Sequence, residues 1–502
     1  MKISAYHHNL KLMILCKKIP YPISIILISL LFTKLGSSQD INLPDMGSPA
    51  DAVLSKSDEA QIGRSIMQQI RNSGSLVEDP QITEYINDIG YRIAVHANES
   101  ERKFTFFVID EPSINAFALP GGYIGVHSGL IEATRSEDEL AGVLAHEIAH
   151  VTQRHIARAV DASQKQSMLS TAIMLGAVIA GAAGAGSDAI QGAMAVAQGT
   201  QAQAQINFTR DNEYEADRIG IAALANAGFD PQGMASFFEV MSGNNSIGSM
   251  RVPEFLKTHP VTSSRIAEAR NRARFYNAKN TTDTRNYGIT RARLIVSNQK
   301  SPQDAVNFYT QKEYKYLSDE EKYGLGLAYQ MAGQLIEAEQ IFTALLNANK
   351  EVIAYHIASA EIMNLLDQEE KAKDIYKRAL ELFPRNIPLV IHYANTLLFQ
   401  NEAELAHKIL LDLLNNVPPT PEQVRLIARA AIQANDPAEA NYYMAEYRFM
   451  IGDLVGGVTF LNRALNIPDL HEIQRIRFEA RIDFVREYMT EEQLQQSRRS
   501  RS

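Results

Sequence analysis

The sequence predicts a mainly α-helical protein with two domains, an N-terminal α+β domain that holds a small sheet and a C-terminal α-solenoid. Three observations support this fold class. Apolar residues recur at helix spacing over most of the chain, three short strand-like runs lie between residues 104 and 127, and a 34-residue repeat marks the C-terminal half. A chain of 502 residues also exceeds what one hydrophobic core usually supports.

The composition excludes one class of partner. The apolar fraction of 45% and the charged fraction of 21% are ordinary for a globular protein. A net charge of -9 gives no electrostatic attraction to nucleic acid, so we expect no nucleic-acid partner.

The N-terminal residues resemble an export signal in their order. Basic residues that include Lys17 and Lys18 precede an apolar run from Ile23 to Phe32, and small residues follow it. This order predicts a cleavable signal peptide over residues 1–38; an uncleaved membrane anchor is the alternative. The single cysteine, Cys16, lies inside this segment, so the exported chain would have neither disulfides nor a catalytic thiol.

The first domain, predicted over residues 39–280, begins with a polar loop and then a helical pattern over 57–97. Strands are expected at 104–109, 115–119 and 123–127, because these runs are rich in β-branched and aromatic residues. The last two strands flank a Pro-Gly-Gly turn.

A buried helix is expected next. Ser136 and Glu139 form a capping box that opens it, and the helical pattern runs through His146 and His150 to about Val160. Apolar or small residues occupy most of its sides, which is typical of a helix inside a core.

The uncharged run 168–186 permits two interpretations. It is long enough to span a membrane, but its glycines weaken a membrane helix. We prefer a helical hairpin that packs beside the preceding helix or lies on a membrane surface, which would give the protein a peripheral membrane contact.

The C-terminal domain is predicted over residues 281–490 from a repeat. Four alanines recur every 34 residues, at Ala338, Ala372, Ala406 and Ala440. A large apolar residue follows each by four positions: Phe342, Tyr376, Leu410 and Met444. This is the tetratricopeptide pattern of paired helices, and such arrays are usually binding surfaces. An irregular helical bundle is the alternative, and residues 491–502 are expected to form a disordered polar tail.

The run His146-Glu147-Ile148-Ala149-His150 carries the chemistry. Two imidazoles at positions i and i+4 share a helix face, so both can reach one zinc ion. Zinc lowers the pKa of a bound water to about 7, and Glu147 is placed to take its proton. The alternative is a pair of surface histidines on an ordinary helix.

A catalytic zinc needs a third protein ligand. The best candidate is Glu213, because Glu213 and Asp217 are also i and i+4 on an expected helix. Asp217 would then accept a hydrogen bond from His146 and fix its tautomer. From the residues alone, Glu213 could equally be a solvated acidic helix start.

Several motifs together resemble the metallopeptidase family that includes the heat-shock membrane protease HtpX and the CAAX prenyl proteases. They are the His-Glu-x-x-His run, the Glu-Tyr-Glu-Ala-Asp run at 213–217, the segment 115–122 and the Thr-His-Pro run at 258–260. The resemblance implies a zincin-like metallopeptidase domain with one zinc ion per chain. It also implies that Glu213 is the third ligand.

The resemblance implies two further roles. His259 would occupy the fourth zinc position and keep the enzyme latent; the alternative is a histidine that merely ends a loop. A substrate would lie as an added strand along four residues, which are Asn115, Ala116, Phe117 and Ala118.

Exported members of this family that carry tetratricopeptide repeats act in outer-membrane protein assembly. The resemblance therefore implies a periplasmic zinc endopeptidase, associated with the outer membrane, that degrades misassembled β-barrel proteins. Its partners would be those proteins and the outer-membrane β-barrel assembly machinery. One alternative is a scaffold or chaperone with a latent peptidase site, and another is an integral membrane peptidase.

Overall fold

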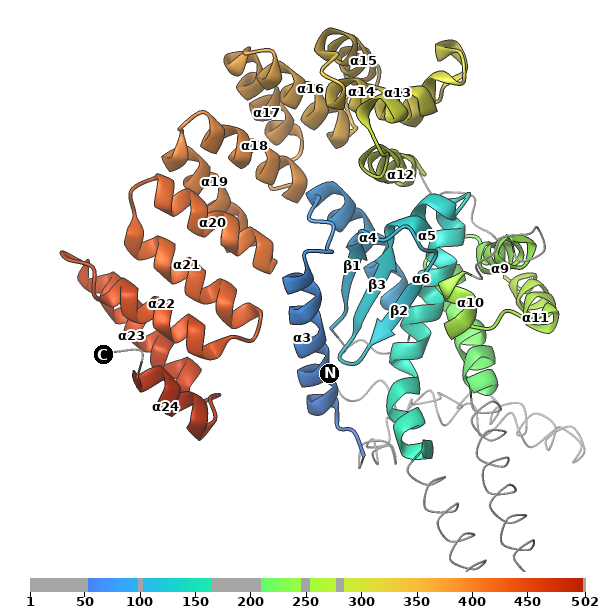
Figure 1. Ribbon diagram of the computed structural model, residues 1–502, viewed down its shortest axis with the longest axis horizontal. Helices are drawn as coiled ribbons and strands as arrows, with labels where there is room; N and C mark the ends of the chain where they lie inside the picture. Colours follow the sequence, from blue (N-terminus) through green and yellow to red (C-terminus); the bar gives the residue numbers. More distant parts are fainter. Residues whose placement is uncertain (1–52, 98–102, 164–208, 245–252, 277–283, 500–502) are drawn as a thin grey trace, which may run out of the picture. The chain divides into compact units, whose positions relative to one another are not determined.

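The computed structural model describes residues 53–97, 103–163, 209–244, 253–276 and 284–499. Within these ranges the chain is mainly α-helical, with one small sheet and a C-terminal array of paired helices, as predicted (Figure 1). The expected signal segment and the run 168–186 lie outside the described residues. Within the described ranges, no helix is both long and apolar enough to cross a membrane.

The sheet has three strands, β1 (Thr105–Ile109), β2 (Ala116–Leu119) and β3 (Tyr123–His127), each within a predicted range. β3 lies in the middle, parallel to β1 and antiparallel to β2. Gly121 and Gly122 make the turn between β2 and β3 at φ values of 81° and 87°, which only glycine adopts easily. β2 is therefore an edge strand, with one side of its backbone not paired within the sheet.

Helices from three parts of the sequence surround this sheet in one core. α4 packs against β1, while α6 packs against β2, β3 and α4. α9 lies along α6, and α11 packs on α9. The bounds are α3 (Lys56–Ser73), α4 (Pro80–Ala94), α5 (Ser128–Ala133), α6 (Glu137–Thr152), α9 (Gln232–Asn244), α10 (Glu254–Thr258) and α11 (Ser263–Ala273). Residues 155–163 and 209–226 are also helical.

The start of α6 follows the prediction only in part. The Ser136 hydroxyl accepts a hydrogen bond from the Glu139 backbone N–H, so Ser136 is the N-cap. The Glu139 carboxylate, however, accepts from the backbone N–H of Arg135 at 2.8 Å and not from that of Ser136. Half of the capping box is present, and Arg135 completes the other half from one residue earlier.

The end of α6 differs from the prediction. The helix stops at Thr152 instead of continuing to about Val160, because Arg154 adopts a left-handed backbone conformation with φ of 53°. Buried contacts hold this conformation: the Arg154 guanidinium donates to the Glu59 carboxylate and to the Leu54 carbonyl. A second helical segment, 155–163, begins after this residue.

The C-terminal helices pair in the predicted repeat. The four alanines of the 34-residue pattern are all buried, and each lies near the start of the second helix of a pair. Gly326 shows why small residues are needed, since a Cβ atom there would lie 2.5 Å from the Phe342 ring. The bounds are α14 (Asp319–Met331), α15 (Leu335–Ala348), α16 (Ile353–Leu365), α17 (Glu369–Leu382), α18 (Ile387–Phe399), α19 (Ala403–Asn416), α20 (Pro421–Gln433), α21 (Pro437–Met450), α22 (Leu454–Leu465) and α23 (Glu472–Arg486).

The two ends of this helical array lie near the predicted domain boundaries, at residues 281 and 491. α12 (Arg285–Ser297) and α13 (Pro302–Thr310) precede the first pair. α12 contributes Tyr287 and Leu294 to the sheet-bearing core and other residues to the first repeat core. At the far end, where we expected a disordered tail from residue 491, the structure instead has helix α24 (Glu491–Arg499).

Candidate metal centre

Two histidines on α6 point into the same space. His146 is completely buried and His150 is largely buried, because α6 lies inside the core on nearly every side. As expected for positions i and i+4, their Nε2 atoms face one another at 3.0 Å. α6 thus presents two ring nitrogens to one point.

The helical segment 209–226 brings a carboxylate to this point. Glu213 is buried, and its two oxygens each lie 3.4 Å from a histidine Nε2, Oε2 from His146 and Oε1 from His150. Glu213 therefore lies where the third metal ligand was expected.

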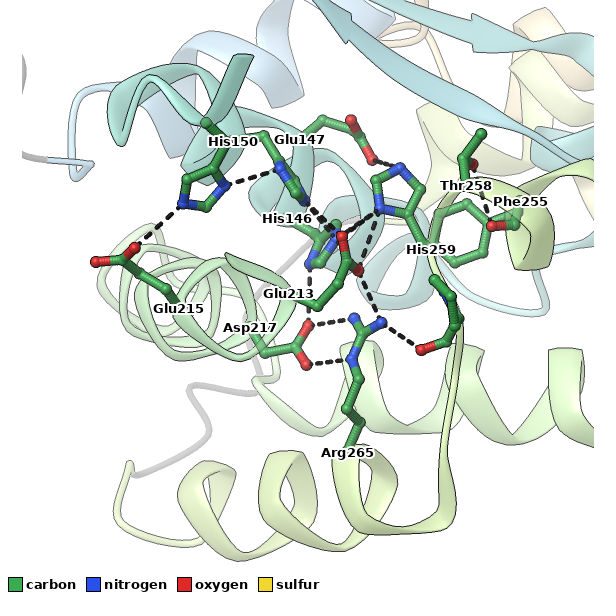
Figure 2. Close-up of polar contacts among 12 residues, drawn as sticks. His146, Glu147, His150, Glu213, Glu215, Asp217, Phe255, Thr258, His259 and Arg265 are labelled. Atoms are coloured by element: carbon green, nitrogen blue, oxygen red, sulfur yellow. Dashed lines mark hydrogen bonds and ion pairs between the residues drawn. The ribbon is translucent and has the colours of Figure 1, made fainter. Parts of the chain in front are cut away.

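His259 completes the group from the residue that follows α10. Its Nδ1 lies 3.3 Å from His146 Nε2 and 3.1 Å from Glu213 Oε1. The ring packs on Phe255, and its backbone N–H donates to the Phe255 carbonyl. This short helix fixes the histidine so that a nitrogen points at the other three donors (Figure 2).

The spacing of these donors fits a tetrahedral metal. Ligands about 2.1 Å from a tetrahedral ion lie about 3.4 Å from one another. The distances given above run from 3.0 to 3.4 Å, and one donor atom from each of His146, His150, Glu213 and His259 lies within 4.8 Å of all the others. Imidazole and carboxylate donors in this geometry suit zinc. The residues therefore fit the ion that the sequence predicts.

Glu147 is buried at the edge of the donor group. Its Oε1 lies 3.5 Å from Nε2 of His259, the ring nitrogen that points away from the other donors. His259 thus stands between Glu147 and the fourth ligand position.

Asp217 and Arg265 support the ligands from behind. Asp217 Oδ1 lies 2.9 Å from His146 Nδ1, the atom from which this carboxylate is expected to accept a hydrogen bond. Arg265, from α11, donates to both oxygens of Asp217 at 2.7 and 2.8 Å and to Glu213 Oε2 at 2.8 Å. The same guanidinium donates to the carbonyl of Pro260, the residue after His259.

The sequence analysis did not name Arg265 as a site residue. It also missed His155, which contacts His150, and Glu215, which contacts His155. The end of α6 at Thr152 explains why the contact between His155 and His150 was not predicted. On a continuous helix His155 would lie about 140° around the axis from His150.

Burial and neighbouring charges set the pKa values of the ligands. Burial lowers the pKa of His150 to about 3, so this imidazole is neutral. Burial opposes protonation of His146 as well, but contacts with Asp217 and Glu213 outweigh it and raise the pKa of His146 to about 9. Although burial raises the pKa of both carboxyls, His146 holds the pKa of Glu213 and Asp217 below their usual values. Both therefore remain carboxylates.

The four predicted substrate-binding residues lie on and next to the edge strand. Asn115 and Ala116 are buried, while Phe117 and Ala118 are half-buried. Ala118 and His150 line a common pocket between the end of β2 and α6. The free edge of β2 and the donor group thus share one side of α6.

The fold and the site define a metallopeptidase joined to a helical repeat domain. Comparison with known proteins agrees: residues 80–273 match the model of peptidase family M48, and residues 367–430 match a tetratricopeptide repeat model.

Relatives extend the similarity over nearly the whole chain. The putative β-barrel assembly-enhancing protease of Vibrio cholerae is 35% identical over 455 residues, which cover 89% of this chain and 93% of that protein. The β-barrel assembly-enhancing protease of Escherichia coli is 34% identical, with coverage of 89% and 91%. The mitochondrial metalloendopeptidase OMA1 of Schizosaccharomyces pombe is 32% identical over 185 residues, which cover 37% of this chain and 51% of that protein. The chain belongs to the family of the β-barrel assembly-enhancing proteases, within peptidase family M48.

Proposed function

We propose that this protein is a zinc-dependent endopeptidase of the periplasm that degrades misassembled β-barrel proteins and assists their assembly at the outer membrane. The relatives named as β-barrel assembly-enhancing proteases support the cellular role. The predicted signal segment supports export. The observation that carries the proposal is the group of four donors beside the buried carboxylate of Glu147.

The chemistry follows from what each residue can do. A zinc ion held by His146, His150 and Glu213 would supply Lewis acidity and lower the pKa of a water in the open ligand position to about 7. Glu147 takes the proton of the attacking water and returns it to the leaving amine. Asp217 keeps the proton of His146 on Nδ1, so that Nε2 faces the metal.

The placement of His259 supports a latent resting state. Its Nδ1 takes the fourth corner of the tetrahedron, and its Nε2 faces Glu147. One side chain thus covers both the open ligand position and the general base. We propose that a substrate or partner displaces His259 when peptide cleavage is required.

Substrate binding is assigned to the edge of the sheet. An extended peptide would add as a strand to β2 along residues 115–118 and so run past the pocket at His150. A peptide in this position would place one of its carbonyl groups beside the metal.

The repeat domain is the proposed docking surface for other proteins. Tetratricopeptide arrays usually bind protein segments. We propose that this one contacts the outer-membrane β-barrel assembly machinery and its unfinished substrates, and that the run 168–186 makes a peripheral membrane contact.

The proposed peptidase activity is tested by Glu147→Gln in the full-length protein. The amide cannot accept the proton of the attacking water, so cleavage of casein should fall by at least about 100-fold while bound zinc stays at one ion per chain. Glu254→Gln, an exposed carboxylate on α10, is the control and should cleave normally. Normal cleavage by Glu147→Gln would refute the mechanism.

A scaffold or chaperone role is the second candidate, favoured by a resting site that His259 covers. The two roles are separated by deleting the gene from cells and supplying the Glu147→Gln variant in its place. If proteolysis is the main function, β-barrel assembly stays defective. If the uncleaving protein restores assembly in full, the scaffold role is the main one.

A further inference from the structure

His155 lies beside Nδ1 of His150, the ring nitrogen that points away from the donor group. The two Nδ1 atoms are 2.9 Å apart, and the ring planes meet at 82° with centroids 4.7 Å apart. On its other side, His155 Nε2 lies 3.2 Å from Glu215 Oε2. His155 is buried, at 4% exposure.

We propose that His155 is a positioning residue for the metal ligand His150, and that Glu215 in turn orients His155. This inference rests on the proposed metal site. It adds a relay of three side chains, Glu215 to His155 to His150, that fixes which nitrogen of His150 is free for the metal.

The relay is consistent with one set of proton positions. A carboxylate can only accept, so His155 must donate its Nε2–H to Glu215. His155 Nδ1 is then an acceptor, and it takes the Nδ1–H of His150. With its proton on Nδ1, His150 keeps the lone pair of Nε2, the atom that faces His146 and Glu213. The opposite tautomer of His150 would point a proton at the metal.

The two carboxylates that support the ligand histidines come from one helix. Asp217 faces His146 directly, whereas Glu215 leaves the same helical segment on a different side (Figure 2). Two residues along a helix turn the direction by about 200°. Segment 209–226 thus reaches both histidines, one by direct contact and one through His155.

The backbone of α6 is arranged for this contact. The left-handed residue Arg154 follows the end of α6, and the next residue, His155, contacts His150. A left-handed backbone conformation is unfavourable for a residue other than glycine. The contacts of Arg154 with Glu59 and Leu54 offset this cost and hold the turn in place.

The experiment compares zinc affinity, measured by competition with a chelator, across four full-length variants. His155→Leu removes both hydrogen bonds of the relay, and we expect zinc to bind about 10 to 100 times more weakly. His155→Asn keeps an acceptor at the Nδ1 position and should recover most of this loss. Glu215→Gln keeps an oxygen for His155 but no charge, so its loss should be intermediate.

Arg158→Met is the matched control. Arg158 donates to the same Oε2 of Glu215 but makes no contact with His150, so its removal should leave zinc affinity within about twofold. The visible spectrum of the cobalt-substituted protein gives a second readout, because a reoriented imidazole changes the ligand field. We expect a changed spectrum for His155→Leu and an unchanged one for Arg158→Met.

Three outcomes would overturn the inference: unchanged zinc affinity in His155→Leu, equal losses in His155→Leu and His155→Asn, or an equal loss in Arg158→Met. The second would show that packing volume matters and the hydrogen bond does not. If the unmodified protein binds no zinc at all, the proposed function and the relay are both overturned, whereas zinc binding that His155→Leu leaves unchanged overturns the relay alone. The two failures are therefore distinguishable.

Discussion

His259 makes contacts through both ring nitrogens, and this shapes how the site can be controlled. Nδ1 lies beside the donor atoms of His146 and Glu213, and Nε2 faces Glu147. The residue follows a helix of only five residues, α10, so a small movement of this segment withdraws both contacts together. Opening the ligand position and freeing the general base would then be one event.

Replacing His259 by alanine is expected to increase cleavage. If the open form is about one tenth of the population, casein cleavage should rise up to about tenfold, because the competing ligand is gone. Zinc should remain bound through the three other ligands. Lys257→Ala, an exposed residue of the same helix, should change neither quantity. Wild-type activity and wild-type zinc content in His259→Ala would together contradict the latch.

Arg265 pairs with two buried carboxylates, and replacing it should lower the free energy of unfolding. Arg265→Met removes the guanidinium that contacts both Asp217 and Glu213, which should destabilise the fold by about 3–5 kcal/mol. Arg272→Met removes a partly exposed pair with Glu268 on the same helix and should cost about 1 kcal/mol or less. Denaturant unfolding in the presence of chelator measures both changes. Equal effects would show that the buried network does not stabilise the fold.

The sequence predicted the site residues unevenly, for physical reasons. His146 and His150, like Glu213 and Asp217, are separated by four positions, so helix periodicity alone places each pair on one face. His259 lies 113 residues from His146, and no local pattern joins them; only the family resemblance indicated it. His155 could not be found, because its contact depends on the backbone of Arg154.

At the scale of elements, the break in α6 shows where local patterns fail. The apolar periodicity continues past Thr152, so it predicts one helix to about residue 160. The helix ends earlier because Arg154 contacts Glu59 and the Leu54 carbonyl, about one hundred residues away in sequence. Tertiary contacts of this kind override helix propensity. The strands and repeat helices were predicted well, because their periodicity and turns are local.

The first residue of α6 gives a testable pH dependence. Burial raises the pKa of Glu137 to about 7, against a hydrogen bond from Tyr85 that lowers it. The folded state therefore binds a proton that the unfolded state releases above about pH 4.5, so stability falls as pH rises from about 4.5 to about 7.

Glu137→Gln should remove this dependence. We expect the variant to be more stable than the wild type by about 1–3 kcal/mol at about pH 8 and equally stable near pH 4.5. Unfolding midpoints across this range measure the difference. Glu111→Gln, an exposed carboxylate, serves as the control. A difference between Glu137→Gln and wild type that does not vary with pH would contradict the assignment.

At the scale of the whole molecule, the four proposed metal ligands all belong to the sheet-bearing domain, while the repeats have separate cores. Zinc should therefore stabilise one part of the chain. At a free zinc concentration of about 100 times Kd, binding adds about 2.7 kcal/mol.

Removing the metal is expected to shift one of two thermal transitions. Chelator should lower the unfolding temperature of the peptidase domain and leave that of the repeats within about 1 °C. Added zinc should restore the first transition, whereas magnesium should not, because the donor set is rich in imidazole. Calorimetry of the full-length protein measures both. Equal shifts would show that the two domains unfold as one unit.

The junction at α12 has a consequence for how this protein can be divided. The Tyr287 hydroxyl donates to the Thr134 carbonyl at 2.7 Å, and Arg291 donates to the Glu132 carbonyl at 3.1 Å. A peptidase fragment that stops at residue 280 would lack Tyr287 and Leu294. The part of the peptidase core that these two side chains cover would then be exposed to water. Gene fusions, truncations and expression fragments should keep α12 with the peptidase, and a protein that lost its repeats in evolution would have to retain this helix.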